Sequence, residues 1–134
     1  MNKALISLLL AGLFFLASCN SKRPQISLSK QAVNLDTIIA NEEKSIAIIM
    51  RNTGDEEAII QGFDCSCECT LPQLKKGDII KAHDSLKLQI TVKGYPDDKG
   101  KWKRVLCTFK TNADSAFSTL NLKYFTKLPV VLKN

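Results

Sequence analysis

The densest chemistry in this 134-residue sequence is a run of cysteines at alternate positions, Cys65, Cys67 and Cys69, followed much later by Cys107. Such thiols can form disulfide staples, exchange disulfides with another protein, or bind a soft ion such as Cu(I) or Zn²⁺. Three complete pairings are open, and the sequence does not choose among them. Residues i and i+2 of an extended strand lie near the upper limit of disulfide reach, so a bond within the run requires a turn there.

The structural interpretation of these cysteines is favoured, because small exported β domains commonly use disulfides as staples. A staple would pin the end of the strand that runs into Cys65 to its neighbour, and Cys107 is the obvious distant partner for either of the first two cysteines of the run. Cys107 points into the core only if Val105 and Phe109 do so as well. The opposite phase, with Leu106 inward, stays open.

Two rival interpretations of the cysteine run remain. In thiol exchange, the carboxylates of Asp64 and Glu68 disfavour a strongly attacking thiolate beside them, so we expect a substrate of a thioredoxin-like reductase and not a reductase. Metal binding by the three clustered thiolates is less favoured, because structural zinc prefers pairs of Cys-x-x-Cys. The lone histidine, His83, is expected to be a solvated loop residue.

The sequence shows no arrangement typical of catalysis. It has one histidine, no glycine-rich phosphate loop and no nucleophile with a matching base and acid. We therefore expect a protein that is not an enzyme and that needs no cofactor.

The N-terminal segment has the features of a targeting sequence and is not expected to be part of the folded domain. A short positive region precedes an apolar run from Ala4 to Ala17, which is shorter than the roughly 20 residues that span a bilayer and fits a signal peptide. The run ends in Leu16-Ala17-Ser18-Cys19, which resembles the lipobox of bacterial lipoproteins. We expect a signal peptide at 1–18, lipidation of Cys19, and a lipidated tether at 19–24.

The lipid anchor sets the expected neighbours of the mature chain. Cleavage leaves 134 − 18 = 116 residues, enough for one domain. Asn20 stands where an aspartate would, by the enterobacterial sorting rule, favour inner-membrane retention. We therefore expect an outer-membrane lipoprotein that faces the periplasm, where nucleic acid is not an expected partner.

Basic and aromatic residues are interleaved at Lys101, Trp102, Lys103 and Arg104. This composition suits contact with phosphate or lipid headgroups, in keeping with a formal net charge of +6. The favoured alternative is that Trp102 packs against the sandwich while the charges keep an edge strand from pairing.

Strand periodicity dominates the mature sequence, and no stretch shows a convincing helical period. Apolar and polar residues alternate most cleanly from Leu86 to Val92. Similar segments separated by turn-forming residues occupy 25–29, 44–51, 57–63, 102–110 and 117–126. We predict an all-β sandwich over residues 25–128, followed by a C-terminal arm at 129–134.

Several short motifs together resemble domain-of-unknown-function family 1573. In order, they are Asn52-Thr53-Gly54, Cys67-Glu68-Cys69-Thr70, the strand Leu86 to Val92, Gly100-Lys101-Trp102, and Thr111-Asn112. The resemblance covers about residues 30 to 126. It implies an exported, often lipid-anchored protein of Bacteroidetes with an immunoglobulin-like β-sandwich, here of about seven strands. The family has no established activity. The chain departs from the family pattern at Glu68, at Ala82-His83-Asp84 and in the extra thiol of Cys65.

The sequence therefore predicts a lipid-anchored, non-catalytic binding or accessory module. Its expected ligand is another envelope protein, engaged through a sheet edge or end loops. The alternatives are a participant in periplasmic thiol–disulfide exchange, with a thioredoxin-like partner, and a soft-metal carrier that uses the cysteine run.

Overall fold

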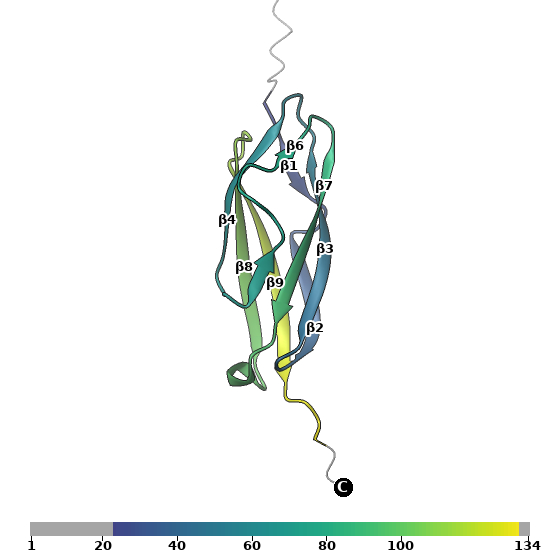
Figure 1. Ribbon diagram of the computed structural model, residues 1–134, viewed down its shortest axis with the longest axis vertical. Helices are drawn as coiled ribbons and strands as arrows, with labels where there is room; N and C mark the ends of the chain where they lie inside the picture. Colours follow the sequence, from purple (N-terminus) through teal and green to yellow (C-terminus); the bar gives the residue numbers. More distant parts are fainter. Residues whose placement is uncertain (1–22, 132–134) are drawn as a thin grey trace, which may run out of the picture.

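The computed structural model describes residues 23–131, and strands make up most of this range (Figure 1). The predicted signal peptide, Cys19 and most of the tether lie outside the described residues. Within 23–131 there is no α-helix, and so no helix that could cross a membrane. Two sheets pack face to face along one long axis.

One sheet contains four strands in the order β1-β3-β7-β5. Its central pair is β3 (Glu43–Asn52) and β7 (Ser85–Lys93), which run antiparallel from Glu43 opposite Lys93 to Arg51 opposite Ser85. The short strands β1 (Ile26–Leu28) and β5 (Thr70–Pro72) form the two edges.

The other sheet contains five strands in the order β2-β9-β8-β4-β6. All pairs are antiparallel except β2 with β9. The strands are β2 (Ala32–Ile39), β4 (Ala58–Cys65), β6 (Ile79–Ile80), β8 (Trp102–Thr111) and β9 (Phe117–Lys127), with a short 3₁₀ helix, η2 (Pro96–Asp98), before β8. The expected edge position for the strand at 102–110 is wrong, because β8 lies between β9 and β4. Arg104 lies on the outer face of this central strand, whereas Lys103 has the inward phase of Val105 and Cys107.

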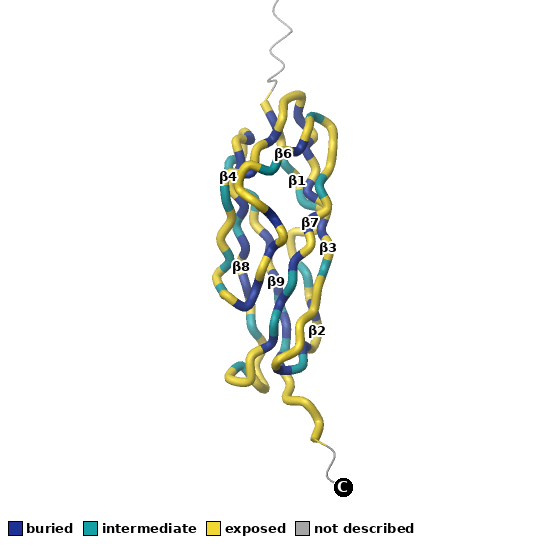
Figure 2. The backbone as a smooth tube through the Cα atoms, viewed as in Figure 1, coloured by how far each residue is buried: buried dark blue, intermediate teal, exposed yellow. Residues whose placement is uncertain are grey.

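The core lies between the two sheets and follows from the alternation of each strand. The inward residues of the central strands are fully buried: Ile48, Met50, Leu88, Ile90 and Val92 from one sheet, and Ile60, Val105, Cys107, Phe109, Leu120, Leu122 and Tyr124 from the other. Figure 2 shows the buried residues alternating with exposed ones along the strands. Each such large side chain contributes about 1.5–3 kcal/mol on burial. The predicted all-β sandwich is confirmed.

Three strands that the sequence analysis did not predict complete the sheets. Strand β2 is interrupted by a register shift between Asn34 and Thr37, where Asp36 adopts a positive φ of 58°. This bulge breaks the period of two that marks a strand in a sequence. β5 and β6 have three and two residues, too few to show a period.

The Asn52-Thr53-Gly54 motif has a structural role at one end of the sandwich. Asn52 is fully buried, and its Nδ2 donates hydrogen bonds to the carbonyls of Glu56 at 2.6 Å and Ile80 at 3.0 Å. Its Oδ1 accepts from the backbone N–H groups of Gln25 and Gly54. One side chain therefore satisfies backbone groups of three separate segments, which a buried apolar residue could not do.

Candidate functional site

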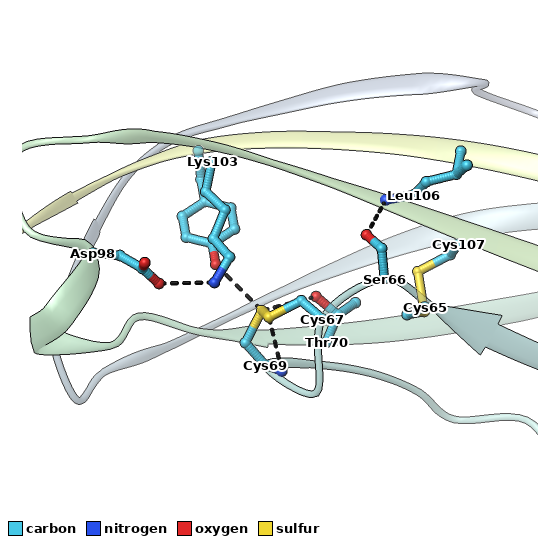
Figure 3. The surroundings of a disulfide bond; sticks show 10 residues. Cys65, Ser66, Cys67, Cys69, Thr70, Asp98, Lys103, Leu106 and Cys107 are labelled. Carbon is cyan, nitrogen blue, oxygen red and sulfur yellow. Dashed lines mark hydrogen bonds and ion pairs between the residues drawn. A yellow bond between two sulfur atoms is a disulfide. The ribbon is translucent and has the colours of Figure 1, made fainter.

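Strands β4 and β8 place Cys65 directly opposite Cys107, and the two sulfurs are bonded (Figure 3). Cys107 is fully buried beside Val105 and Phe109, whereas Leu106 is 44% exposed. Of the two phases that the sequence left open, the structure therefore has Cys107 facing the core. The disulfide joins the last residue of β4 to the middle of β8 within one sheet.

Ser66 extends this cross-strand link by one residue. Its N–H donates to the carbonyl of Leu106 at 2.9 Å, and its Oγ accepts from the Leu106 N–H at 2.9 Å. The side chain thus replaces a backbone carbonyl in the ladder. The position of the chain is fixed as it leaves β4, and the turn that follows starts from a defined point.

The second disulfide, Cys67–Cys69, lies in the turn that connects β4 to β5. The Thr70 N–H donates to the Cys67 carbonyl at 3.2 Å, which closes the turn, and the Lys93 N–H donates to the Cys69 carbonyl at 2.8 Å, which ties it to β7. A bond within the cysteine run was expected to require a turn, and the structure has a turn at this place. With both disulfides formed, the run offers no group of three thiolates.

The two sulfurs of the turn have different surroundings. Cys69 is 4% exposed, and its Sγ lies 3.3 Å from the Tyr124 hydroxyl and 3.6 Å from the Thr70 hydroxyl. Cys67 is only partly buried. Burial raises the pKa of the Tyr124 phenol, which keeps its proton at neutral pH and can donate it to sulfur. The inner sulfur therefore has a hydrogen-bond donor beside it.

Lys103 adds a positive charge to this polar cluster. It is the cross-strand partner of Tyr124, so both side chains leave the sheet on the same face. Its Nζ lies 2.8 Å from Asp98 Oδ2 on η2, and this hydrogen bond raises the pKa of the amine. Figure 3 shows the Lys103–Asp98 pair on the same side of β8 as the Cys67–Cys69 turn. We call Tyr124, Lys103 and Asp98 the polar frame.

The basic and aromatic motif does not form one patch. Alternation along β8 turns Lys103 inward and leaves Trp102 and Arg104 on the outer face. There the Trp102 ring is 54% exposed and carries the Lys123 ammonium at 4.4 Å from its centre. Lys101 precedes the strand and is exposed. Contact of this motif with phosphate or lipid stays a prediction; the start of β8 lies at the opposite end of the sandwich from residue 23 (Figure 1).

His83 lies in an exposed turn, where its Nε2 is 2.8 Å from Asp55 Oδ1. Within residues 23–131, no group of three or more His, Cys, Asp or Glu side chains is arranged to hold a metal ion.

An apolar groove beside the end of β4 was not predicted from the sequence, and neither was the contact of Cys69 with Tyr124. β6 pairs only with Ala58 and Ile59, so no other described strand covers the outer edge of β4 beyond that point. The groove has a volume of about 560 Å³ and is lined by Phe63, Leu71, Pro72, Gln73, Leu74, Lys75 and Asp78. Leu71 is 64% exposed. The available signal in the sequence was Leu71, an apolar residue two positions after Cys69.

The order of motifs, the two sheets and the CxC turn can now be compared with known proteins. The profile of a family described as proteins of unknown function, DUF1573, matches residues 26–125. The chain belongs to this family. No curated protein is similar enough in sequence to count as a relative. Membership in DUF1573 agrees with the resemblance seen in the sequence, and it brings no activity with it.

Solved structures show how this DUF1573 domain relates to other sandwiches. A protein of unknown function from Porphyromonas gingivalis W83 aligns with a TM-score of 0.66 and 16% identity over 83% of this chain and 50% of its own. The PapD-like domain 7 of human CEP192 aligns with a TM-score of 0.62 and 8% identity over 83% of this chain and 89% of that domain. The chain thus spans half of the Porphyromonas protein. At these identities the likeness shows the fold alone.

A third structure comes from a chaperone complex. The CsuC–CsuE chaperone–tip adhesion subunit complex of Acinetobacter baumannii aligns with a TM-score of 0.56 and 18% identity, over 77% of this chain and 52% of that one. The DUF1573 chain therefore has an immunoglobulin-like, PapD-like β-sandwich.

Proposed function

We propose that this protein is a non-catalytic binding module that takes up an extended segment of another envelope protein along the outer edge of β4. The observation that carries the proposal is the apolar groove of about 560 Å³ beside an edge that β6 leaves uncovered after Ile59. A strand added at an open edge gains main-chain hydrogen bonds, and neighbouring pockets select its side chains.

The shape of the groove suits such a segment. Phe63 on β4 and Leu71 on β5 supply apolar surface from the two opposite sheets. The loop between β5 and β6 closes one end of the edge, where the Ile60 N–H donates to the Asp78 carbonyl and the Gly77 N–H donates to the Ile60 carbonyl. An incoming strand would therefore start beyond Ile60 and run toward Cys65.

The compartment belongs to the same proposal. The lipobox-like sequence ending at Cys19 supports a lipoprotein in the outer membrane, with its domain in the periplasm. The sandwich fold also occurs in the chaperone–tip adhesion subunit complex of chaperone-usher pili. Incorporation of labelled palmitate that disappears in Cys19→Ala tests the anchor, and unchanged incorporation would exclude it.

Site-specific photo-crosslinking in intact cells tests the groove. A photoreactive amino acid at Leu71 is expected to capture one envelope protein, identified by mass spectrometry, and the additional substitution Phe63→Lys is expected to abolish the capture. The same probe at Phe117, which is 58% exposed on β9, is the matched control. Equal capture at Leu71 and Phe117, or capture that survives Phe63→Lys, would refute the proposal. Turnover of a substrate by the purified protein would refute its non-catalytic part.

A further inference from the structure

The Cys67–Cys69 disulfide has one accessible end and one enclosed end. Cys67 is partly exposed in the turn, whereas Cys69 is 4% exposed and its Sγ touches the Tyr124 hydroxyl at 3.3 Å. Nothing in the binding proposal uses this asymmetry. Both sulfurs have a donor nearby, but only that of Cys69 is a side-chain hydroxyl: the Cys69 N–H lies 3.1 Å from Cys67 Sγ, and the Tyr124 O–H faces Cys69 Sγ.

We propose that Cys67–Cys69 is a thiol–disulfide exchange site that oxidises a dithiol protein, with Cys67 as the attacked sulfur and Cys69 as the leaving group. The role goes beyond binding and does not depend on the groove.

The direction of attack follows from the arrangement of the two sulfurs. Exchange proceeds by in-line displacement, in which the incoming thiolate, the attacked sulfur and the leaving sulfur lie on one line. Because Cys69 Sγ lies inward against Tyr124, the extension of that line beyond Cys67 Sγ leads outward from the core. Attack on Cys69 would need an approach through the buried residues of β9. Cys67 is therefore the sulfur that an external thiolate reaches.

The surroundings of Cys69 suit a departing thiolate. The Tyr124 O–H can donate to the developing negative charge, and the Thr70 hydroxyl lies 3.6 Å from the same sulfur. Lys103, opposite Tyr124 in the ladder, supplies a positive charge that Asp98 holds in place at 2.8 Å. A hydrogen bond to a charged group is stronger than one to a neutral group, so the Tyr124 hydroxyl favours the thiolate over the disulfide sulfur.

The exchange balances without any further reagent. A thiolate of the partner forms a bond to Cys67 Sγ, the Cys67–Cys69 bond breaks, and Cys69 leaves as a thiolate. The partner's second thiolate then attacks its own first sulfur, which breaks the mixed disulfide and releases Cys67 as a thiolate. The two protons given up by the partner's thiols end on Cys67 and Cys69. The partner becomes a disulfide, and this chain gains two electrons as a dithiol.

The fold can accept this change without losing the turn. The backbone bonds from Thr70 to Cys67 and from Lys93 to Cys69 do not involve sulfur. Cys65–Cys107 remains as a separate link, with Cys107 fully buried. Reduction of the turn is therefore a local event.

The trapping experiment uses the full protein, extracted in detergent, and a thioredoxin whose resolving cysteine is replaced by serine. This probe can attack but cannot complete the exchange, so a mixed disulfide accumulates. Peptide mass spectrometry is expected to find the probe on Cys67. An adduct on Cys69, an adduct only on Cys65 or Cys107, or no adduct would overturn the proposal.

A second experiment tests Tyr124 as a positioning residue. Tyr124→Phe keeps the ring and removes the hydroxyl, and it is expected to slow adduct formation about tenfold, the equivalent of one hydrogen bond to a charged group. It should also raise the pKa of the Cys69 thiol in the reduced protein, followed by ultraviolet thiolate absorbance against pH. Tyr95→Phe, which changes the other tyrosine in the same way, is the matched control. If Tyr124→Phe forms the adduct at the wild-type rate and its Cys69 thiol titrates as in the wild type, the role assigned to Tyr124 is wrong.

Discussion

Cys65–Cys107 and Cys67–Cys69 begin two residues apart in the chain, yet they belong to different physical environments. The first joins β4 to β8 across a sheet and spans 42 residues of sequence, whereas the second spans two residues within a turn. Each disulfide has one partly buried cysteine, Cys65 or Cys67, and one buried cysteine, Cys107 or Cys69. The two disulfides also differ in their contacts, because the Tyr124 hydroxyl lies 3.3 Å from Cys69 Sγ of the second one.

The two disulfides are expected to differ in how much they stabilise the folded domain. In the chain-entropy model, a disulfide stabilises by closing a loop in the unfolded chain, and the effect grows with the logarithm of loop length. The 42-residue span corresponds to about 4 kcal/mol and the two-residue span to about 1 kcal/mol. A cross-link that contributes so little to folding can be broken without unfolding the domain. The difference in loop length supports a structural role for Cys65–Cys107 and the proposed exchange role for Cys67–Cys69.

The largest expected effect comes from removing the cross-strand link. Cys107→Ala should lower the free energy of unfolding by about 4 kcal/mol, because it opens the long loop and leaves a small gap in the core. Urea denaturation of the non-reduced protein measures this. Cys65→Ala, at the partly exposed end of the same disulfide, is the control for the gap. If Cys107→Ala lowers the free energy of unfolding no more than removal of the Cys67–Cys69 disulfide does, the two disulfides do not differ in their structural role.

A smaller effect is expected in the order of reduction. A water-soluble phosphine should reduce Cys67–Cys69 about tenfold faster, or more, than Cys65–Cys107. Both cysteines of the Cys65–Cys107 bond lie within the β4–β8 ladder beside the Ser66–Leu106 hydrogen bonds, and this ladder must open locally before the reductant reaches them. Timed alkylation with peptide mass spectrometry follows both bonds in one sample. Simultaneous reduction of the two disulfides would mean that they open in one cooperative event.

Removing the turn disulfide should change stability by less. Cys67→Ser combined with Cys69→Ser is expected to lower the free energy of unfolding by on the order of 1 kcal/mol, since the loop it opens is short. Serine at position 69 keeps a polar atom near the Tyr124 hydroxyl. The measurement is the same urea titration. A loss of about 4 kcal/mol would show that the turn, too, is a structural staple.

The smallest effect concerns the polar frame and pH. The pKa of Lys103 is raised from 10.5 in the folded protein, first by its hydrogen bond to Asp98. Stability from this pair is therefore present below that value and lost as the pH rises through the higher folded-state pKa. Both side chains are partly exposed, so the change should stay below about 1 kcal/mol. Between about pH 10 and 12, the free energy of unfolding should therefore fall less for Lys103→Met than for the wild type.

Lys101→Met, which removes an exposed lysine of the same motif, is the control and should follow the wild-type curve. A Lys103→Met curve that coincides with the wild type would show that the frame contributes nothing to stability at the turn. The comparison would then rest on accessibility alone.

Much of the fold could be predicted because its long strands bury one face. Leu88, Ile90 and Val92 alternate with polar residues, and the structure buries all three. The bulged strand β2 and the short strands β5 and β6 could not be found in this way. Their pairing depends on neighbours that are remote in sequence, and a period of two needs several residues to be seen. The same limit misplaced β8 at an edge, because alternation reports a face and not a neighbour.

The candidate site divides along the same line. The positions of the cysteines are given by the sequence, and strand geometry predicts that a bond within the run needs a turn. It could not predict that Cys69 would meet Tyr124, which lies 55 positions away, or that Lys103 would face the same side. The interleaved motif suggested one basic patch, and strand alternation split it between two faces.

The sequence by itself determined the all-β class, the family and the positions of the thiols, since these depend on local periodicity and residue type. Only the tertiary structure decided which sulfurs meet, which of them is enclosed, and which edge lies open beside a groove. Register is the physical reason. A shift of β4 against β8 by one residue would turn Cys65 away from Cys107, and that register is set by the packing of the whole sheet.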